Sequence, residues 1–67
     1  MAVAKIIEIV ASSEKSWDDA VKEGLARANR TLKGITGVEL ASQKMKVENG
    51  QVKEYRVHLK VTFILEG

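Results

Sequence analysis

Residues 47–65 read VENGQVKEYRVHLKVTFIL and decide the fold of this chain. Asn49-Gly50 stands between two strand patterns, and this residue pair strongly favours a two-residue β-hairpin turn. From residue 51 to residue 65 apolar and polar residues alternate, which places the two sets on opposite faces of a strand. The apolar face is formed by Tyr55, Val57, Leu59, Val61, Phe63 and Leu65, and the polar face by Arg56, His58, Lys60 and Thr62. We expect the apolar face to pack under a helix and the polar face to meet water, a ligand or a second subunit.

The strand that precedes the hairpin is expected over residues 37–48. Val38 and Leu40 share one parity along this segment, whereas Met45 and Val47 share the other. Such a phase change near residues 42–44 predicts a β-bulge or a bend.

Upstream, the sequence predicts one further strand and one helix. Residues 3–11 are rich in β-branched side chains and predict a strand that is buried on much of both faces. Ser16 followed by Asp19 is a relaxed capping box, so a helix is expected over residues 17–33 with Gly34 as the C′ residue that ends it. Its apolar positions follow a 3–4 spacing: Trp17, Ala20, Val21, Gly24, Leu25, Ala28 and Leu32.

These elements define the expected fold class as α+β. Residues 1–67 would form a single domain, a βαββ unit whose three-stranded antiparallel sheet packs on one helix. The third strand would lie between the first and the second.

The length of the chain predicts self-association. A domain of 67 residues has a small core and needs additional stabilisation from disulfides, a metal or oligomerisation. There is no cysteine, and His58 is the only histidine, so neither a disulfide nor an imidazole-rich metal site is expected. Association with copies of itself remains.

Charge and hydropathy predict a cytoplasmic protein with neither a membrane nor a nucleic acid as partner. The net charge is only +2, and basic and acidic residues are interspersed. Lys5 and Glu8 interrupt the first apolar stretch, which excludes a signal peptide there. No nucleophile with a base, no paired carboxylates on an apolar face and no phosphate-cradling glycine loop is found, so the chain is not expected to be an enzyme.

Several short segments, taken together in this order and spacing, resemble the dodecins, small flavin-binding proteins of bacteria and archaea. The resemblance covers most of the chain and rests on the following segments: Lys5-Ile6-Ile7-Glu8, Ser12-Ser13, Leu25-Ala26-Arg27-Ala28, Thr31-Leu32, Glu39 and Val57-x-x-Lys60-Val61-x-Phe63-x-Leu65-Glu66. It implies a βαββ fold, a hollow homododecamer with 23 symmetry and flavins bound as stacked pairs across two-fold axes.

The resemblance also indicates the candidate site. The family's flavin-stacking tryptophan falls on Gly37, and its ring-recognising glutamine falls on Arg56. With Gln43, these two residues are the candidate ligand-binding residues near the expected two-fold pocket. The resemblance implies a storage protein for a small ligand, with riboflavin or FMN weakly bound as the leading candidate. The alternative is a structural shell whose vestigial flavin site leaves its surface to bind ions such as calcium, or another partner.

Individual side chains have alternative interpretations. Arg56 can grip a phosphate or carboxylate, or pair with Glu39 or with an acid of another subunit. Asp18, Asp19 and Glu23 can ligate calcium, although helix capping explains the two aspartates, so no metal ligand is assigned. Lys44 and Lys46 either bind a phosphate or are solvated edge-strand lysines. Trp17 is expected to be a packing residue, and His58 a surface or interface residue.

Overall fold

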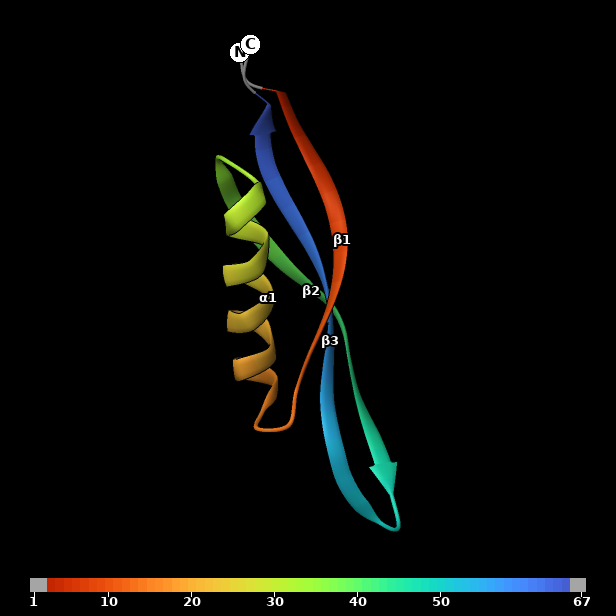
Figure 1. The fold of residues 1–67 in the computed structure, drawn as a ribbon. Helices are drawn as coiled ribbons and strands as arrows, with labels where there is room; N and C mark the ends of the chain where they lie inside the picture. The colour runs from red at the N-terminus through yellow and green to blue at the C-terminus, as the bar shows by residue number, and fades with distance from the viewer. Residues whose placement is uncertain (1–2, 66–67) are drawn as a thin grey trace.

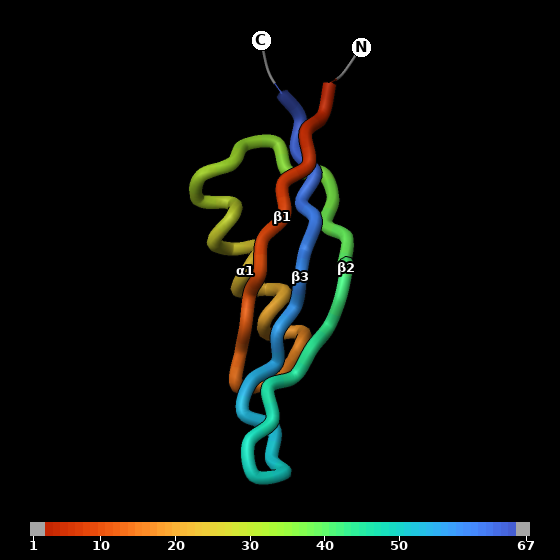
Figure 2. The backbone as a smooth tube through the Cα atoms, turned by 90° about the vertical axis from the view of Figure 1, so that its right-hand side faces the viewer, coloured from red at the N-terminus to blue at the C-terminus, as the bar shows by residue number. Residues whose placement is uncertain are grey.

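The computed structural model describes residues 3–65, which form one three-stranded sheet and one helix (Figure 1). The elements are β1 (Val3–Ser13), α1 (Trp17–Thr31), β2 (Ile35–Glu48) and β3 (Gln51–Leu65). Both pairings are antiparallel, and the strand order β1-β3-β2 places β3 in the centre (Figure 2). The predicted α+β class and βαββ arrangement are confirmed.

The central strand β3 holds the sheet together. β1 pairs with it from Val3 opposite Leu65 to Ser13 opposite Tyr55. β1 therefore extends two residues beyond the predicted end at residue 11, because Ser12 and Ser13 still find partners on β3. β2 likewise starts at Ile35, two residues before the predicted start, because Ile35 already pairs with Phe63 of β3.

The helix starts where the sequence predicts and ends earlier. The Ser16 hydroxyl accepts a hydrogen bond of 3.0 Å from the Asp19 backbone N–H, which caps the first turn. The predicted end at residue 33 is wrong: the helix ends at Thr31, and Leu32 is extended. The side chain of Leu32 packs against the core, which explains why the chain leaves the helix there. Gly34 is therefore not the C′ residue of the helix: it lies three residues beyond Thr31 and has φ +74°, a conformation that favours glycine.

The core lies between α1 and one face of the sheet. Val57, Leu59 and Val61 of β3 are fully buried, and Ala20 of α1 packs against them. Gly24 is buried on the same helix face, and a Cβ there would lie 2.9 Å from the Ala11 Cβ. The small residues of α1 therefore let the helix approach the sheet closely.

The phase change predicted in the second strand is a set of bulges. The register of β2 against β3 shifts between Ile35 and Gly37, between Leu40 and Ser42, and between Lys46 and Val47. The middle shift leaves Leu40 opposite Leu59 and Met45 opposite Tyr55, so apolar residues of opposite parity reach the same face. The bulge lies at residue 41, just before the predicted segment.

The β2–β3 hairpin turns at Asn49 and Gly50, as predicted. Both residues have positive φ, 51° and 76°, which matches a type I′ turn. The hairpin extends past the ends of α1 and β1 as a two-stranded ribbon (Figure 1). Apolar side chains on this ribbon stay exposed, among them Met45, Val47 and Val52.

The prediction that β1 is buried on both faces is wrong for the subunit. Ile7 and Ile9 pack against the core, whereas Ile6 and Val10 are 59% and 63% exposed. One helix can cover only one face of a sheet, so the other face of β1 has no cover within residues 3–65. In the same described part of the chain, no helix combines the length and apolar character needed to cross a membrane.

Candidate ligand-binding surface

The candidate site lies on the face of the sheet that points away from α1, which we call the open face. On β3 this face carries Arg56, His58, Lys60 and Thr62, which alternate with the buried core residues. The register brings Ser12, Val10, Glu8 and Ile6 of β1 and Lys44, Ser42, Glu39 and Gly37 of β2 to the same face. The predicted polar face therefore exists and is accessible.

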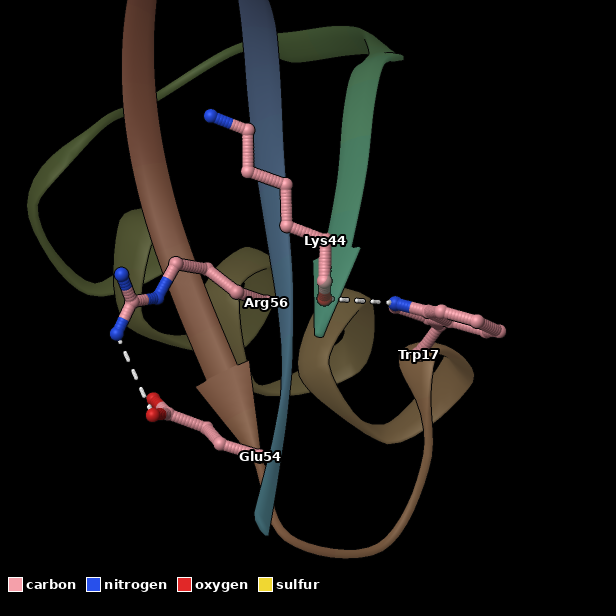
Figure 3. Close-up of polar contacts among 4 residues, drawn as sticks. All are labelled: Trp17, Lys44, Glu54 and Arg56. Carbon is pink, nitrogen blue, oxygen red and sulfur yellow. Dashed lines mark hydrogen bonds and ion pairs between the residues drawn. The ribbon is translucent and has the colours of Figure 1, made fainter. Parts of the chain in front are cut away.

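Arg56 lies at one end of this row on the central strand and forms an ion pair within its own strand. Its Nη2 atom donates to the Glu54 Oε2 at 3.3 Å, and half of the Arg56 side chain is exposed (Figure 3). Pairing with Glu39 within the subunit is wrong, because Glu39 lies opposite Lys60, four residues further along β3. At about 3.3 Å per residue, that is roughly 13 Å along the strand.

Glu54 is held ionised by its surroundings. A hydrogen bond from the Ser12 side chain is the largest cause that lowers the pKa of Glu54. Arg56 lowers the pKa further through its charge and its hydrogen bond, and Lys46, the register partner of Glu54, adds a smaller charge effect. Desolvation opposes these effects only in part.

His58 has an acidic partner that lies far from it in sequence. Its Nε2 atom lies 2.9 Å from Glu8 Oε1 across the β1–β3 ladder, and both side chains are partly exposed. The prediction that His58 is a surface residue is confirmed for the subunit. Its acidic partner is fifty positions away in sequence, and only the strand pairing brings the two residues together.

Gly37 lies at the other end of the open face, in register with Thr62. A Cβ at Gly37 would meet no heavy atom within 4 Å, so a larger side chain has room there. Gly37 also lines a groove of about 550 Å³ between β2 and α1, together with Leu25, Ala26 and Asn29. The aromatic side chains of residues 3–65 belong to the helix-covered side, so the open face of this subunit does not fit a flavin that requires an aromatic platform.

The three candidate residues do not converge within one subunit. Gln43 lies opposite the buried Val57 and is therefore on the side of the sheet that faces α1, where it is exposed. Arg56 and the register partner of Gly37, Thr62, are six residues apart on β3, which corresponds to roughly 20 Å.

Trp17 packs at the start of α1, as predicted. Its ring lies edge-on to Tyr55 with centroids 5.2 Å apart. Its Nε1 atom donates to the Lys44 carbonyl oxygen at 3.3 Å, whereas the Lys44 side chain extends away from the indole (Figure 3). Trp17 thus joins the helix to the backbone of β2 and is a fluorescent reporter of that strand.

The acidic residues of the helix start serve local structure. Asp19 accepts a 2.6 Å hydrogen bond from the Ser13 hydroxyl, and Ser16 caps the helix. Glu23 lies further along α1, beside a groove against β1. Within residues 3–65, no group of three or more His, Cys, Asp or Glu side chains is positioned to hold a metal ion.

The chain belongs to a class of small ligand-binding proteins. The βαββ unit with its open sheet face fits this class, and the comparisons with known proteins show it. The dodecin family model matches residues 3–66. The chain is 38% identical over 64 residues to the dodecin of Thermus thermophilus, covering 96% of this chain and 93% of that protein. It is 33% identical over 63 residues to the calcium dodecin of Mycobacterium tuberculosis, covering 94% and 89%. This chain belongs to the dodecin family.

The solved structures agree with this assignment. The dodecin of Streptomyces coelicolor superposes with a TM-score of 0.94 at 32% identity, over 98% of this chain and 94% of that chain. The crystal structure of the Mycobacterium tuberculosis calcium dodecin, a protein described as having a novel calcium-binding site, superposes with a TM-score of 0.83 at 32% identity, over 96% of this chain and 91% of that chain. Relatives that superpose this closely support the predicted fold along the whole described chain.

Proposed function

We propose that residues 1–67 act as one unit of a homododecamer that binds and stores a small ligand, with riboflavin or FMN as the leading candidate. The observation that carries the proposal is the open face, which no element of the subunit covers within residues 3–65. It has a row of polar side chains on β3 and exposed apolar residues beside that row. A non-catalytic binding role fits this face. The cytoplasmic location and the absence of nucleic-acid partners stay predictions from the sequence.

Exposed apolar side chains support self-association. The exposed fraction of the large apolar residues ranges from 36% for Val38 to 63% for Val10, and they occur on β1, β2, β3 and α1. Because these side chains are already partly buried, each stabilises an assembly by about 0.5–2 kcal/mol when it becomes fully buried. A second copy of the chain is the partner that a small core of this kind requires.

Association also explains how separated candidate residues can serve one ligand. Gly37, Gln43 and Arg56 lie on different parts of the subunit, so a site that includes all three needs more than one copy. We expect flavin binding to be weaker than in dodecins with a stacking tryptophan, because stacking on an aromatic side chain contributes about 1–3 kcal/mol per ring by analogy with nucleobases.

The test is the substitution Gly37→Trp, followed by riboflavin and FMN fluorescence titration. Gly37 has an ordinary φ and open space around its Cβ position, so the indole can be accepted without backbone strain. We expect the flavin dissociation constant to fall by about tenfold or more, consistent with one stacked ring. Gly37→Ala is the matched control, because it adds the Cβ without the aromatic ring. Equal affinities for the two variants would contradict a flavin pocket at Gly37.

The second candidate is a shell that binds calcium. It is favoured by the relative from Mycobacterium tuberculosis that carries the name calcium dodecin. Calcium binding to chelator-treated protein, measured by calorimetry and lost in Asp18→Asn and Glu23→Gln, would support it. Saturable flavin quenching together with no calcium heat would exclude it.

A further inference from the structure

The turn at Asn49 and Gly50 places a chemically labile residue pair at an accessible position. Both residues lie between β2 and β3, are exposed, and have positive φ values of 51° and 76°. Asparagine is thermolabile, because its side-chain amide carbon can be attacked by the backbone nitrogen of the next residue. Glycine in that next position has no Cβ beside its nitrogen. A Cβ at Gly50 would meet no heavy atom within 4 Å, so no neighbouring group shields the nitrogen either.

The two reacting groups are free of competing hydrogen bonds. Among the described residues, 3–65, the Asn49 side chain makes no hydrogen bond, and the Gly50 N–H makes none outside the strand ladder. The ladder ends with Glu48 opposite Gln51, and the two turn residues of such a hairpin lie outside that pair. The Asn49 amide and the Gly50 nitrogen are therefore accessible to each other and to water.

The end of the hairpin is weakly held, which matters because ring closure requires Asn49 to rotate out of its turn conformation. β1 ends opposite Tyr55, so residues 46–54 pair only with one another, and this ribbon extends past α1 and β1 (Figure 1). Its apolar side chains Val47 and Val52 are 56% and 44% exposed. Segments with few buried contacts open locally at a lower free energy than the whole protein unfolds. The turn can therefore open while the core stays intact.

We propose that Asn49 is a site of spontaneous deamidation in the folded protein, reached through local opening of the hairpin end. The Gly50 backbone nitrogen gives its proton to solvent base and attacks the Asn49 Cγ atom. The new N–Cγ bond forms, the Cγ–Nδ2 bond breaks, and the side-chain nitrogen takes up a proton and leaves as ammonia. Water then opens the resulting succinimide at either carbonyl and gives aspartate or isoaspartate. The reaction consumes one water, releases one ammonia and needs neither an oxidant nor a cofactor.

The isoaspartate product changes the hairpin more than the aspartate product does. Isoaspartate adds one methylene to the main chain between residues 49 and 50, so the turn no longer has the backbone geometry of a two-residue type I′ turn. Turn geometry fixes the register of a hairpin, and the register of β2 against β3 sets which side chains stand opposite one another. Aspartate keeps the backbone and adds a negative charge beside Glu48. Modification at Asn49 thus acts on strand pairing and is separate from the proposed ligand binding.

The experiment incubates the assembled protein at mildly alkaline pH and follows its peptides by mass spectrometry, with aspartate and isoaspartate separated by chromatography. We expect both products at residue 49. Asn29 is the internal control: it lies within α1, where the helix fixes its backbone, and should stay unmodified over the same period. Asn49→Gly should abolish the modification and keep the fold, because two glycines also favour a type I′ turn. The rate should fall as the pH falls, because the attacking nitrogen must lose its proton.

A core variant distinguishes local opening from global unfolding. Leu59→Ala should raise the unfolded population by about 30-fold or more, because it truncates a fully buried side chain. If the reaction proceeds through local opening, its rate in Leu59→Ala stays that of the unchanged protein. A rate that rises with the unfolded population would overturn the proposal, because the reaction would then belong to the unfolded chain. An Asn49 that stays intact in the folded protein, whether or not it reacts in urea, would overturn it as well.

Discussion

The two faces of the sheet carry side chains from the same strand and differ in almost everything else. On the helix-covered face, Val57, Leu59 and Val61 are fully buried against α1. On the open face, Arg56 and His58 alternate with them, remain accessible and pair with acids of the sheet itself. The covered face holds the subunit together, and the open face is where we propose that a ligand or another copy binds. Alternate residues of one strand therefore serve the core and the proposed binding surface.

The largest expected effect comes from truncation in the covered face. Leu59→Ala should lower the free energy of unfolding by about 2–5 kcal/mol, because it removes a fully buried side chain and leaves a cavity. Urea unfolding followed by circular dichroism measures the loss. Leu40→Ala is the control: Leu40 is the register partner of Leu59 but is 45% exposed, so its loss should be much smaller. Equal losses would mean that a second copy covers Leu40.

A charge on the open face should weaken self-association. Ile6 is 59% exposed in the subunit, and Ile6→Lys should cost the assembly about 1.5–3 kcal/mol per subunit if this side chain is buried there. Analytical ultracentrifugation across a range of concentrations should show smaller species for the variant. Gln51→Lys places the same charge beside the hairpin turn and should leave assembly intact. An unchanged Ile6→Lys oligomer would show that the interface lies elsewhere.

The glycine in the helix distinguishes close packing from open space. Gly24→Ala should destabilise the protein by about 1 kcal/mol, because overpacking costs about 1–3 kcal/mol and the gain in helix propensity offsets about 1 kcal/mol. The new Cβ would lie 2.9 Å from the Ala11 Cβ, so α1 or β1 has to move. Gly37→Ala, with no atom within 4 Å, should lower stability very little. Thermal melting of both variants tests the contrast, and a more stable Gly24→Ala would contradict the close approach of helix and sheet.

The smallest effect concerns the charge network of the open face. The pKa of Glu54 is lowered in the folded protein, chiefly by the hydrogen bond from Ser12. A lowered pKa means that the stabilisation is present above the unfolded-state pKa and is lost as the pH falls through the folded-state pKa. Ser12→Ala should raise the pKa of Glu54, as measured by an NMR titration of the side-chain carboxyl carbon. Arg56→Gln should raise it as well, because Arg56 acts through both its charge and its hydrogen bond. An unchanged pKa in Ser12→Ala would contradict the hydrogen bond from Ser12.

Much of the fold follows from local patterns. Asn49-Gly50 predicted the hairpin, the alternation from residue 51 to residue 65 predicted β3, and the Ser16 cap predicted the start of α1. The predicted ends of β1, β2 and α1 differ by two residues from those observed, because strand pairing and the packing of Leu32 decide where an element stops. These contacts involve residues distant in sequence.

The candidate site was harder to predict. The pairing of Arg56 with Glu39 is wrong within the subunit; its partner is Glu54, two residues away on the same face of β3, a spacing that the alternation of the strand contains. The sequence contained no local signal for the pair His58–Glu8. The three candidate residues Gly37, Gln43 and Arg56 lie apart, because the bulges of β2 and the pleat of the sheet send them to different faces and ends.

The sequence by itself determined the types and order of the elements, the turn, and which side of β3 would face the helix, because these depend on periodicity and on local backbone preferences. Of that predicted face, Val57, Leu59 and Val61 are buried, whereas Leu65 is 47% exposed. The tertiary structure alone decided the register of the strands, and with it which charges stand opposite one another. The register makes Lys44 the direct partner of Arg56 across the β2–β3 ladder. On the other side, Glu8 is the direct partner of Lys60 and the diagonal neighbour of His58. A shift of one residue would send each of these side chains to the other face, so the register decides the chemistry of the open face.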